Sequence, residues 1–177
     1  MEIEVKFRIF EDKKDIIKEI LTKGFEKTKQ SHQKDVYYLS GKKIAGKNLY
    51  LRTREDFLKN TFSYDLHEVI SDLSTKETEL EVRSKKDLDK LDYITETLGF
   101  KKLVVVDKKR MCLRKNDLTL VFDHVEGLGD FIEIEVEGNN EQEALVIIKK
   151  YQKILNLKNI NKITEKGYPD LILQKKQ

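Results

Sequence analysis

The sequence of 177 residues contains no tryptophan, a single proline and a single cysteine. Because Cys112 has no partner in the chain, no intrachain disulfide can form, and nothing indicates an oxidising compartment. No apolar run approaches the roughly 20 residues that a membrane-spanning helix needs. The first residues also lack the basic and apolar regions of a signal peptide. We therefore expect a cytoplasmic protein with no membrane partner.

The sequence also lacks an excess of charge of one sign, although 38% of its residues are charged. The 35 Lys and Arg residues nearly balance the 32 Asp and Glu residues, which leaves a net charge of +3. A nucleic-acid-binding module depends on a concentrated positive surface, so no nucleic-acid partner is expected. Periodic apolar residues argue against disorder. At this length we expect one domain, residues 1–177, with a substantial core.

Strict alternation of apolar and charged residues marks the beginning of the chain. Ile3, Val5 and Phe7 alternate with Glu4 and Lys6. Because side chains alternate between the two faces of a β-strand, this segment predicts one apolar and one charged face. For an isolated strand, the ordinary interpretation is a solvated outer face. The pattern returns in residues 79–83 and 133–137, which indicates a shared charged surface with a function.

The rest of the chain divides into short strands and amphipathic helices. Asp12 and Ser84 are predicted N-caps, and Gly24 and Gly99 end the two helices. Each helix follows a charged strand and is closed by a Gly-Phe pair, which predicts an internal pseudo-repeat. The only proline, Pro169, predicts the first turn of a helix near the end of the chain. Further strands are predicted in residues 25–39, 49–55, 61–67 and 118–125, and residues 101–107 and 108–115 form one long strand or a bent one. A turn is predicted in 41–47, a polar loop in 68–74, and a helix starting near residue 140.

About eight strands and three or four helices predict an α+β fold. We expect a closed eight-stranded antiparallel β-barrel, a tunnel with a charged interior and with the helices packed outside. In this arrangement the apolar strand faces point outward and are covered by the helices. The candidates for the inner surface are Glu2, Glu4, Lys6, Arg52, Arg54, Glu79, Glu81, Lys108, Arg110, Asp123, Glu133 and Glu135.

An interior of both signs is suited to a metal-bound polyphosphate. Charged groups are costly to remove from water, so such a lining stays hydrated or holds a ligand. Mg²⁺ and Mn²⁺ prefer carboxylate oxygens. Arg and Lys bind phosphate oxygens, and Arg can do so with two parallel hydrogen bonds. The alternate spacing on strands places both kinds of group on one face.

Five motifs in order resemble the CYTH superfamily, the triphosphate tunnel metalloenzymes. Residues 2–6 match the ExExK signature, residues 51–54 resemble the LRxR strand, and residues 108–110 resemble the KxR strand. Asp123 with Glu133-Ile134-Glu135 is similar to the family's acidic strands, and residues 166–171 are similar to its closing segment, with Gly167 in place of a serine. The resemblance covers almost the whole chain. The run from Val125 to Glu135 is most like the class IV adenylyl cyclases.

The resemblance implies a role for each of these groups. The cofactor would be Mg²⁺ or Mn²⁺, and the substrate a small-molecule triphosphate such as ATP, thiamine triphosphate or tripolyphosphate. Lys6, Arg54 and Arg110 would act in catalysis by stabilising charge, and a homodimer is compatible with the family. The metal would be held by Glu2, Glu4, Asp123, Glu133 and Glu135, and the triphosphate by Lys6, Arg52, Arg54, Lys108 and Arg110.

The sequence leaves three functions open. A class IV cyclase lets the ribose 3′-hydroxyl attack the α-phosphate and releases pyrophosphate. A triphosphatase directs water to the γ-phosphate, and a third alternative is a non-catalytic binding protein. The third is favoured by Asp65, which stands where the family often has a phosphate-binding lysine, unless Lys59 or Lys76 substitutes for it. The register of Glu79 and Glu81 relative to the family is also open.

The histidines and tyrosines carry weaker signals. His32, His67 and His124 are scattered without the spacing of a zinc site, so we interpret them as ordinary surface or core residues. Tyr37 and Tyr38 are predicted to pack in the core, with the alternative that one of them lines the cavity.

Overall fold

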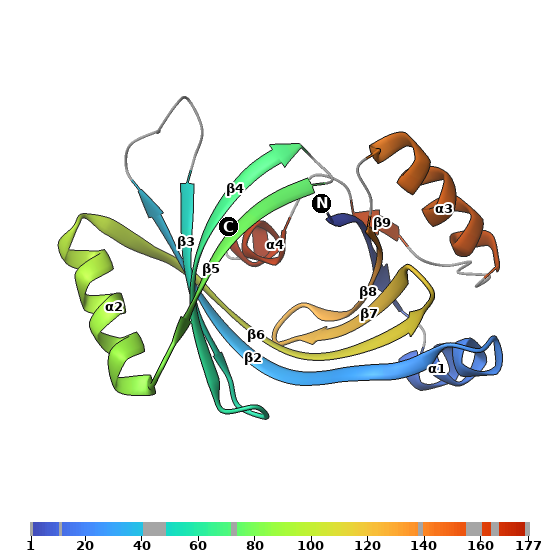
Figure 1. The fold of residues 1–177 in the computed structure, drawn as a ribbon, viewed down its shortest axis with the longest axis horizontal. Helices are drawn as coiled ribbons and strands as arrows, with labels where there is room; N and C mark the ends of the chain where they lie inside the picture. Colours follow the sequence, from blue (N-terminus) through green and yellow to red (C-terminus); the bar gives the residue numbers. More distant parts are fainter. Residues whose placement is uncertain are drawn as a thin grey trace.

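The computed structural model describes residues 2–10, 12–40, 49–71, 74–137, 140–154, 161–163 and 167–175. Within these residues the chain forms one antiparallel sheet and four helices, so the predicted α+β class is confirmed (Figure 1). In chain order the elements are β1 (Glu2–Ile9), α1 (Lys13–Thr22), β2 (Glu26–Ser40), β3 (Leu49–Asp56), β4 (Thr61–Ser71), β5 (Ser74–Val82), α2 (Lys85–Thr97), β6 (Phe100–Lys115), β7 (Leu118–Val125), β8 (Gly129–Glu137), α3 (Glu141–Ile154), β9 (Asn161–Ile163) and α4 (Tyr168–Lys175).

The strand order confirms the internal pseudo-repeat. The sheet runs β5-β4-β3-β2-β6-β7-β8-β1-β9, and the two longest strands, β2 and β6, pair at its centre. The first half of the chain contributes β1, α1, β2, β3 and β4, and the second contributes β5, α2, β6, β7 and β8 in the same order. The two halves exchange their first strands, because β1 pairs with β8 and β5 pairs with β4.

Closure of the sheet into a barrel is not confirmed. Strands β5 and β9 stand at the two ends of the order, and no ladder within the described residues joins these edges. The sheet is strongly curved, and β5 approaches β1 (Figure 1). Strand β9 pairs with β1 at Lys6, Phe7 and Arg8, on the edge that a closing strand would need.

Two segments differ from the prediction, and a third lies outside the described residues. The polar loop expected in residues 68–74 is mostly strand, since β4 continues to Ser71 and β5 begins at Ser74. The short strand β9 was not predicted. Residues 101–107 and 108–115, predicted as one long strand or a bent one, belong to the single long strand β6. The turn predicted in residues 41–47 lies outside the described residues.

The predicted helix boundaries are confirmed by local chemistry. The carboxylate of Asp12 accepts a hydrogen bond from the backbone N–H of Lys14, and the hydroxyl of Ser84 accepts one from Asp87. These caps satisfy backbone donors that have no partner inside the helix. Gly24, at a φ of 81°, follows α1 in a conformation that favours glycine. Pro169 stands in the first turn of α4, as expected.

The hydrophobic core lies on the outer, convex side of the sheet. Helices α1 and α3 cover the apolar face of β1, β7 and β8, and α2 covers the apolar face at the other end, around Phe62 and Val82. A buried side chain of this size contributes about 1.5–3 kcal/mol to folding. The members around α1 and α3 include Ile3, Val5, Phe7, Ile20, Leu120, Phe122, Ile132, Ile134, Ala144 and Ile148.

The concave side is left for the alternate, charged side chains. Helices α1, α2 and α3 lie outside the curve of the sheet, whereas α4 lies inside it (Figure 1). Tyr168 of α4 packs there against Val106, Val125 and Phe131. The predicted inversion, with apolar faces outward and charged faces inward, is confirmed where α1, α2 and α3 cover the sheet. The prediction that the helices pack outside is wrong for α4, because the apolar patch of Val106, Val125 and Phe131 on the concave side gives this helix a packing surface (Figure 1). No helix within the described residues has the length and apolar character to cross a membrane.

Candidate active site

The ladder between β1 and β8 brings the acidic residues of both strands together. Glu4 lies opposite Glu135, and Lys6 lies opposite Glu133. Because opposed residues of paired strands project on the same face, all four side chains share the concave side. The expectation that these two charged strands form one surface is confirmed for these residues. Glu2 pairs with Glu137 through its backbone, but its side chain lies outside the described residues.

Three carboxylates are close enough to hold one metal ion. One ligand oxygen from each of Glu4, Glu133 and Glu135 lies within 4.8 Å of the others. Glu133 is buried, while Glu4 and Glu135 are half-buried and accessible from the concave side. Three carboxylate oxygens match the preference of Mg²⁺ and Mn²⁺ for oxygen ligands. The residues present therefore fit the ion that the sequence predicts.

A lysine ammonium already pairs with two of these three carboxylates. Lys6 Nζ lies 2.9 Å from Glu133 Oε1 and 3.5 Å from Glu4 Oε1. Burial opposes the charge of Lys6, but the attraction of Glu133 and Glu4 outweighs burial and raises its pKa. Burial likewise opposes ionisation of Glu133, yet Lys6 and Arg110 hold its pKa far below the usual range. Both groups are therefore charged at neutral pH.

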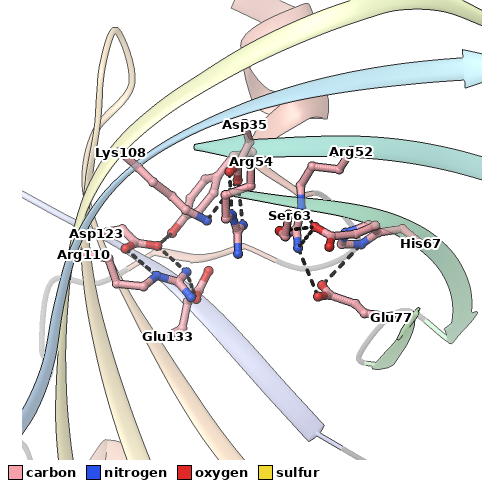
Figure 2. A network of polar contacts seen from close by, with 12 residues as sticks. Asp35, Arg52, Arg54, Ser63, His67, Glu77, Lys108, Arg110, Asp123 and Glu133 are labelled. Atoms are coloured by element: carbon pink, nitrogen blue, oxygen red, sulfur yellow. Dashed lines mark hydrogen bonds and ion pairs between the residues drawn. The ribbon is translucent and has the colours of Figure 1, made fainter. Parts of the chain in front are cut away.

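Arg110 links this group to β7. Its Nε and Nη2 atoms donate to the two oxygens of Asp123 at 2.8 and 2.6 Å, and Nη2 also donates to Glu133 at 2.7 Å (Figure 2). The hydroxyl of Tyr168 donates to Asp123 Oδ2 at 2.9 Å. Asp123 thus positions Arg110 and Tyr168, and it does not belong to the carboxylate group around Glu4. Its assignment as a metal ligand stays a prediction.

A second ion-pair group is centred on Asp35 of β2. Arg54 donates to both of its oxygens at 2.6 and 2.7 Å, and Lys108 Nζ lies 3.6 Å from Oδ2 (Figure 2). Burial alone would raise the pKa of Asp35, but Lys108 and Arg54 lower it well below the usual range. Burial and the nearby Arg110 lower the pKa of Lys108 to about 8.

Arg52 stands apart from the other predicted phosphate-binding cations. Its Nε atom donates to Asp65 Oδ2 at 2.7 Å, and its Nη2 atom donates to Glu77 Oε2 at 3.2 Å. Asp65 therefore neutralises Arg52. Of the two proposed substitutes, Lys59 is exposed in the turn between β3 and β4, and the side chain of Lys76 lies outside the described residues.

The pairing of β5 with β4 is defined, while the register of Glu79 and Glu81 relative to the family stays open. Glu79 lies opposite Asp65, and Glu81 lies opposite Ser63. Both glutamates are on the concave side but exposed, so the structure does not bring them to the carboxylate group of Glu4, Glu133 and Glu135.

Sequence reasoning gave no role to Asp35 and Tyr168. The alternation of polar residues along β2, with Ser31, Gln33 and Asp35 buried on one face, is a signal that could have indicated Asp35. Tyr168 belongs to the closing segment that the resemblance identified, but its contacts depend on how α4 packs inside the curved sheet. Its ring centroid lies 4.4 Å from Lys6 Nζ and 5.5 Å from Lys108 Nζ, so the ring face interacts with two cations.

The two tyrosines of β2 have separate environments. Tyr38 is buried, and its hydroxyl donates to Asp92 Oδ1 of α2 at 2.8 Å, which confirms the packing interpretation for this residue. Tyr37 faces the concave side, where its ring centroid lies 6.0 Å from that of His67. The alternative that one of the pair lines the interior is thus confirmed for Tyr37.

The structure thus has a charged concave side on an antiparallel sheet of two pseudo-repeats. A comparison with known protein families gives a direct match. The family model of the CYTH domain matches residues 1–167. The chain belongs to the CYTH family. A Methanocaldococcus jannaschii protein named "Putative adenylate cyclase" is 30% identical over 174 residues, which covers 97% of this chain and 98% of the relative.

Solved structures share the fold over nearly the full length. A Pyrococcus horikoshii protein of 30% identity superposes with a TM-score of 0.81, covering 97% of this CYTH chain and 99% of the other. A Hippeastrum putative adenylyl cyclase, reported with a dominant triphosphatase activity, superposes with a TM-score of 0.64 at 19% identity, covering 88% of each chain. At this identity the Hippeastrum likeness concerns the fold.

Proposed function

We propose that this CYTH protein is a metal-dependent enzyme that acts on a nucleoside triphosphate, as an adenylyl cyclase that converts ATP to cyclic AMP and pyrophosphate. The observation that carries the proposal is the adjacency of two groups on the concave side. The carboxylates of Glu4, Glu133 and Glu135 form one ligand set. Lys6 and Arg110 contact Glu133 directly, so phosphate-binding cations border the metal ligands.

The roles of the side chains follow from this arrangement. Glu4, Glu133 and Glu135 would hold Mg²⁺ or Mn²⁺, which when bound neutralises phosphate oxygens and stabilises the leaving group. Lys6, Arg110, Lys108 and Arg54 bind the remaining phosphate oxygens, and the two arginines do so with planar pairs of donors. Because these groups are held by buried ion pairs before substrate arrives, little reorganisation accompanies the reaction.

The relative with the adenylate cyclase name supports the cyclase reaction. It is 30% identical and spans both chains almost completely. In that reaction the chain must position the ribose 3′-hydroxyl against the α-phosphate, with pyrophosphate as the leaving group.

The second candidate is a triphosphatase. It is favoured by the Hippeastrum neighbour, because a protein of this fold is reported there with a dominant triphosphatase activity. Both reactions use the same metal ligands and cations. They differ in whether a substrate hydroxyl or a water attacks, and in which phosphorus is attacked.

Product analysis separates these reactions. The purified protein is incubated with ATP and, separately, with tripolyphosphate, in Mg²⁺ and in Mn²⁺. Cyclic AMP with pyrophosphate supports the cyclase, whereas ADP or diphosphate with phosphate supports the triphosphatase. Turnover should be lost in Glu133→Gln and kept in Glu19→Gln, a matched change on the exposed face of α1. Binding of both compounds without turnover would overturn both enzymatic assignments.

A further inference from the structure

Two buried acceptor atoms on β4 lack a hydrogen-bond partner within the described residues. They are Asp65 Oδ1 and His67 Nε2. Asp65 is fully buried, and His67 is 8% exposed. Residues two apart on a strand project on the same face, and here that face is the concave side, since Asp65 lies opposite Arg52. Buried polar atoms are nearly always hydrogen-bonded, so two neighbouring exceptions indicate a missing ligand.

The chemistry of His67 shows that its unpartnered nitrogen is an acceptor. Nδ1 lies 3.3 Å from Glu77 Oε1. An ionised carboxylate can only accept, so Nδ1 carries the proton in this pair. Burial and the nearby Arg52 lower the pKa of His67 to about 4, which leaves the ring neutral. Nε2 therefore holds a lone pair. Burial raises the pKa of Asp65, but the ion pair with Arg52 favours its charged form, in which Oδ1 is also an acceptor. Both atoms therefore require hydrogen-bond donors.

We name Arg52, Asp65, His67 and Glu77 the acceptor cluster; Figure 2 labels Arg52, His67 and Glu77. The charges of the cluster do not favour phosphate. Its single cation, Arg52, is balanced by Asp65 at 2.6 Å and by Glu77 at 3.2 Å. One positive charge against two carboxylates and a neutral imidazole gives a negative environment. The proposed phosphate-binding side contains the cations Lys6, Lys108 and Arg110, which attract anions instead.

The acceptor cluster lies next to the proposed phosphate-binding side. Arg54, which is held by Asp35, stands two residues from Arg52 on the same face of β3. A molecule that reaches from Lys108 past Arg54 would thus place its other end at Asp65 and His67. Tyr37, whose ring centroid is 6.0 Å from that of His67, provides an aromatic wall beside the cluster.

We propose that the acceptor cluster binds the organic end of the substrate, by accepting hydrogen bonds from amino or hydroxyl donors attached to the triphosphate. This inference rests on the proposed function and deepens it, since it defines the substrate as an organic triphosphate with donor groups. ATP carries such donors, and inorganic tripolyphosphate carries none. Asp65, in the position of a phosphate-binding lysine, thereby becomes a residue that determines specificity.

The test measures whether the cluster distinguishes these two ligands. Dissociation constants of ATP and tripolyphosphate are determined by calorimetry with Ca²⁺ as the supporting cation, and product analysis after each titration confirms that the ligand is intact. In Asp65→Asn the amide oxygen will turn to the donors of Arg52, so its NH₂ group faces the ligand and replaces an acceptor by a donor. His67→Phe keeps an aromatic ring beside Tyr37 and removes the acceptor nitrogen.

We expect each variant to weaken ATP binding about tenfold or more and to change tripolyphosphate binding less than about twofold. Asp117→Asn, in the exposed turn between β6 and β7, is the matched control and should leave both constants unchanged. If the variants weaken the binding of ATP and of tripolyphosphate equally, or change neither dissociation constant, the inference is overturned. A wild-type protein that binds neither ligand would instead overturn the proposed function. Should Asp65→Asn fail to fold, His67→Phe decides the question alone.

Discussion

Lys6 Nζ lies 2.9 Å from Glu133 Oε1, and the two residues face one another directly in the ladder between β1 and β8. The ammonium thus occupies the carboxylate that the proposed metal ion requires. A metal ion held by Glu133 would compete with Lys6 for this carboxylate and would free Lys6 to contact phosphate. Metal binding and triphosphate binding should therefore reinforce one another.

The competition between Lys6 and metal gives opposite expectations for two variants. Glu4→Gln removes a ligand charge and should weaken Mn²⁺ binding about tenfold, equivalent to 1.4 kcal/mol. Lys6→Ala removes the competitor, so it should strengthen Mn²⁺ binding while weakening tripolyphosphate binding. Calorimetry with each ligand alone measures both effects. If Lys6→Ala weakens Mn²⁺ binding, the competition is refuted.

Asp35 is expected to be a main determinant of stability. Asp35→Asn leaves Arg54 and Lys108 buried without their countercharge, which should reduce the free energy of unfolding by about 3–5 kcal/mol. Asp107→Asn is the control, because that carboxylate is partly exposed beside His32 and should contribute less than about 1 kcal/mol. Urea unfolding measures both. Added tripolyphosphate should stabilise Asp35→Asn more than the wild type, since the anion replaces the lost charge, and equal stabilisation would contradict this role.

Triphosphate affinity should fall as the pH rises through about 8, because the pKa of Lys108 is lowered to about 8. Above that pH the free protein holds Lys108 neutral between Arg110 and Arg54, and binding a polyanion requires it to take up a proton. Above pH 8 the triphosphate affinity should fall by up to about tenfold for each pH unit. Lys108→Arg stays charged, so it should bind with a flatter pH profile. Calorimetry between pH 7 and 9.5 checks this, and identical profiles would exclude Lys108 as the titrating group.

The hydroxyl and the ring of Tyr168 are expected to have separate roles, the hydroxyl in stability through Asp123 and the ring in triphosphate binding. Tyr168→Phe removes the hydrogen bond to Asp123 and should lower the free energy of unfolding by about 1 kcal/mol. The ring remains under Lys6 and Lys108, so tripolyphosphate affinity should change little. Tyr168→Leu removes the ring as well and should weaken that affinity several-fold. Denaturation and calorimetry on both variants separate the two contributions, and similar affinities would show that the ring has no part in binding.

Much of the fold could be predicted because its signals are local. Alternation in β1 and β8 determined that Glu4, Lys6 and Glu133 would share a face opposite to the apolar residues, since the two-residue period of a strand needs no tertiary information. The caps at Asp12 and Ser84 were equally evident, because a cap bonds to the backbone two or three residues away. The position of the hydrophobic core on the outer side of the sheet followed from the apolar faces of these strands.

Only the tertiary structure decided which charges meet. The pairing of Arg52 with Asp65 and of Arg54 with Asp35 depends on the register between strands, and the position of Tyr168 depends on how α4 enters the curved sheet. The three residues of β9 carry too little pattern to predict, yet they occupy an edge of β1 and so affect closure. The sequence by itself determined which side chains face inward. Long-range pairing decided which of them remain available to a ligand, because register and curvature are properties of strands brought together, and not of any strand alone.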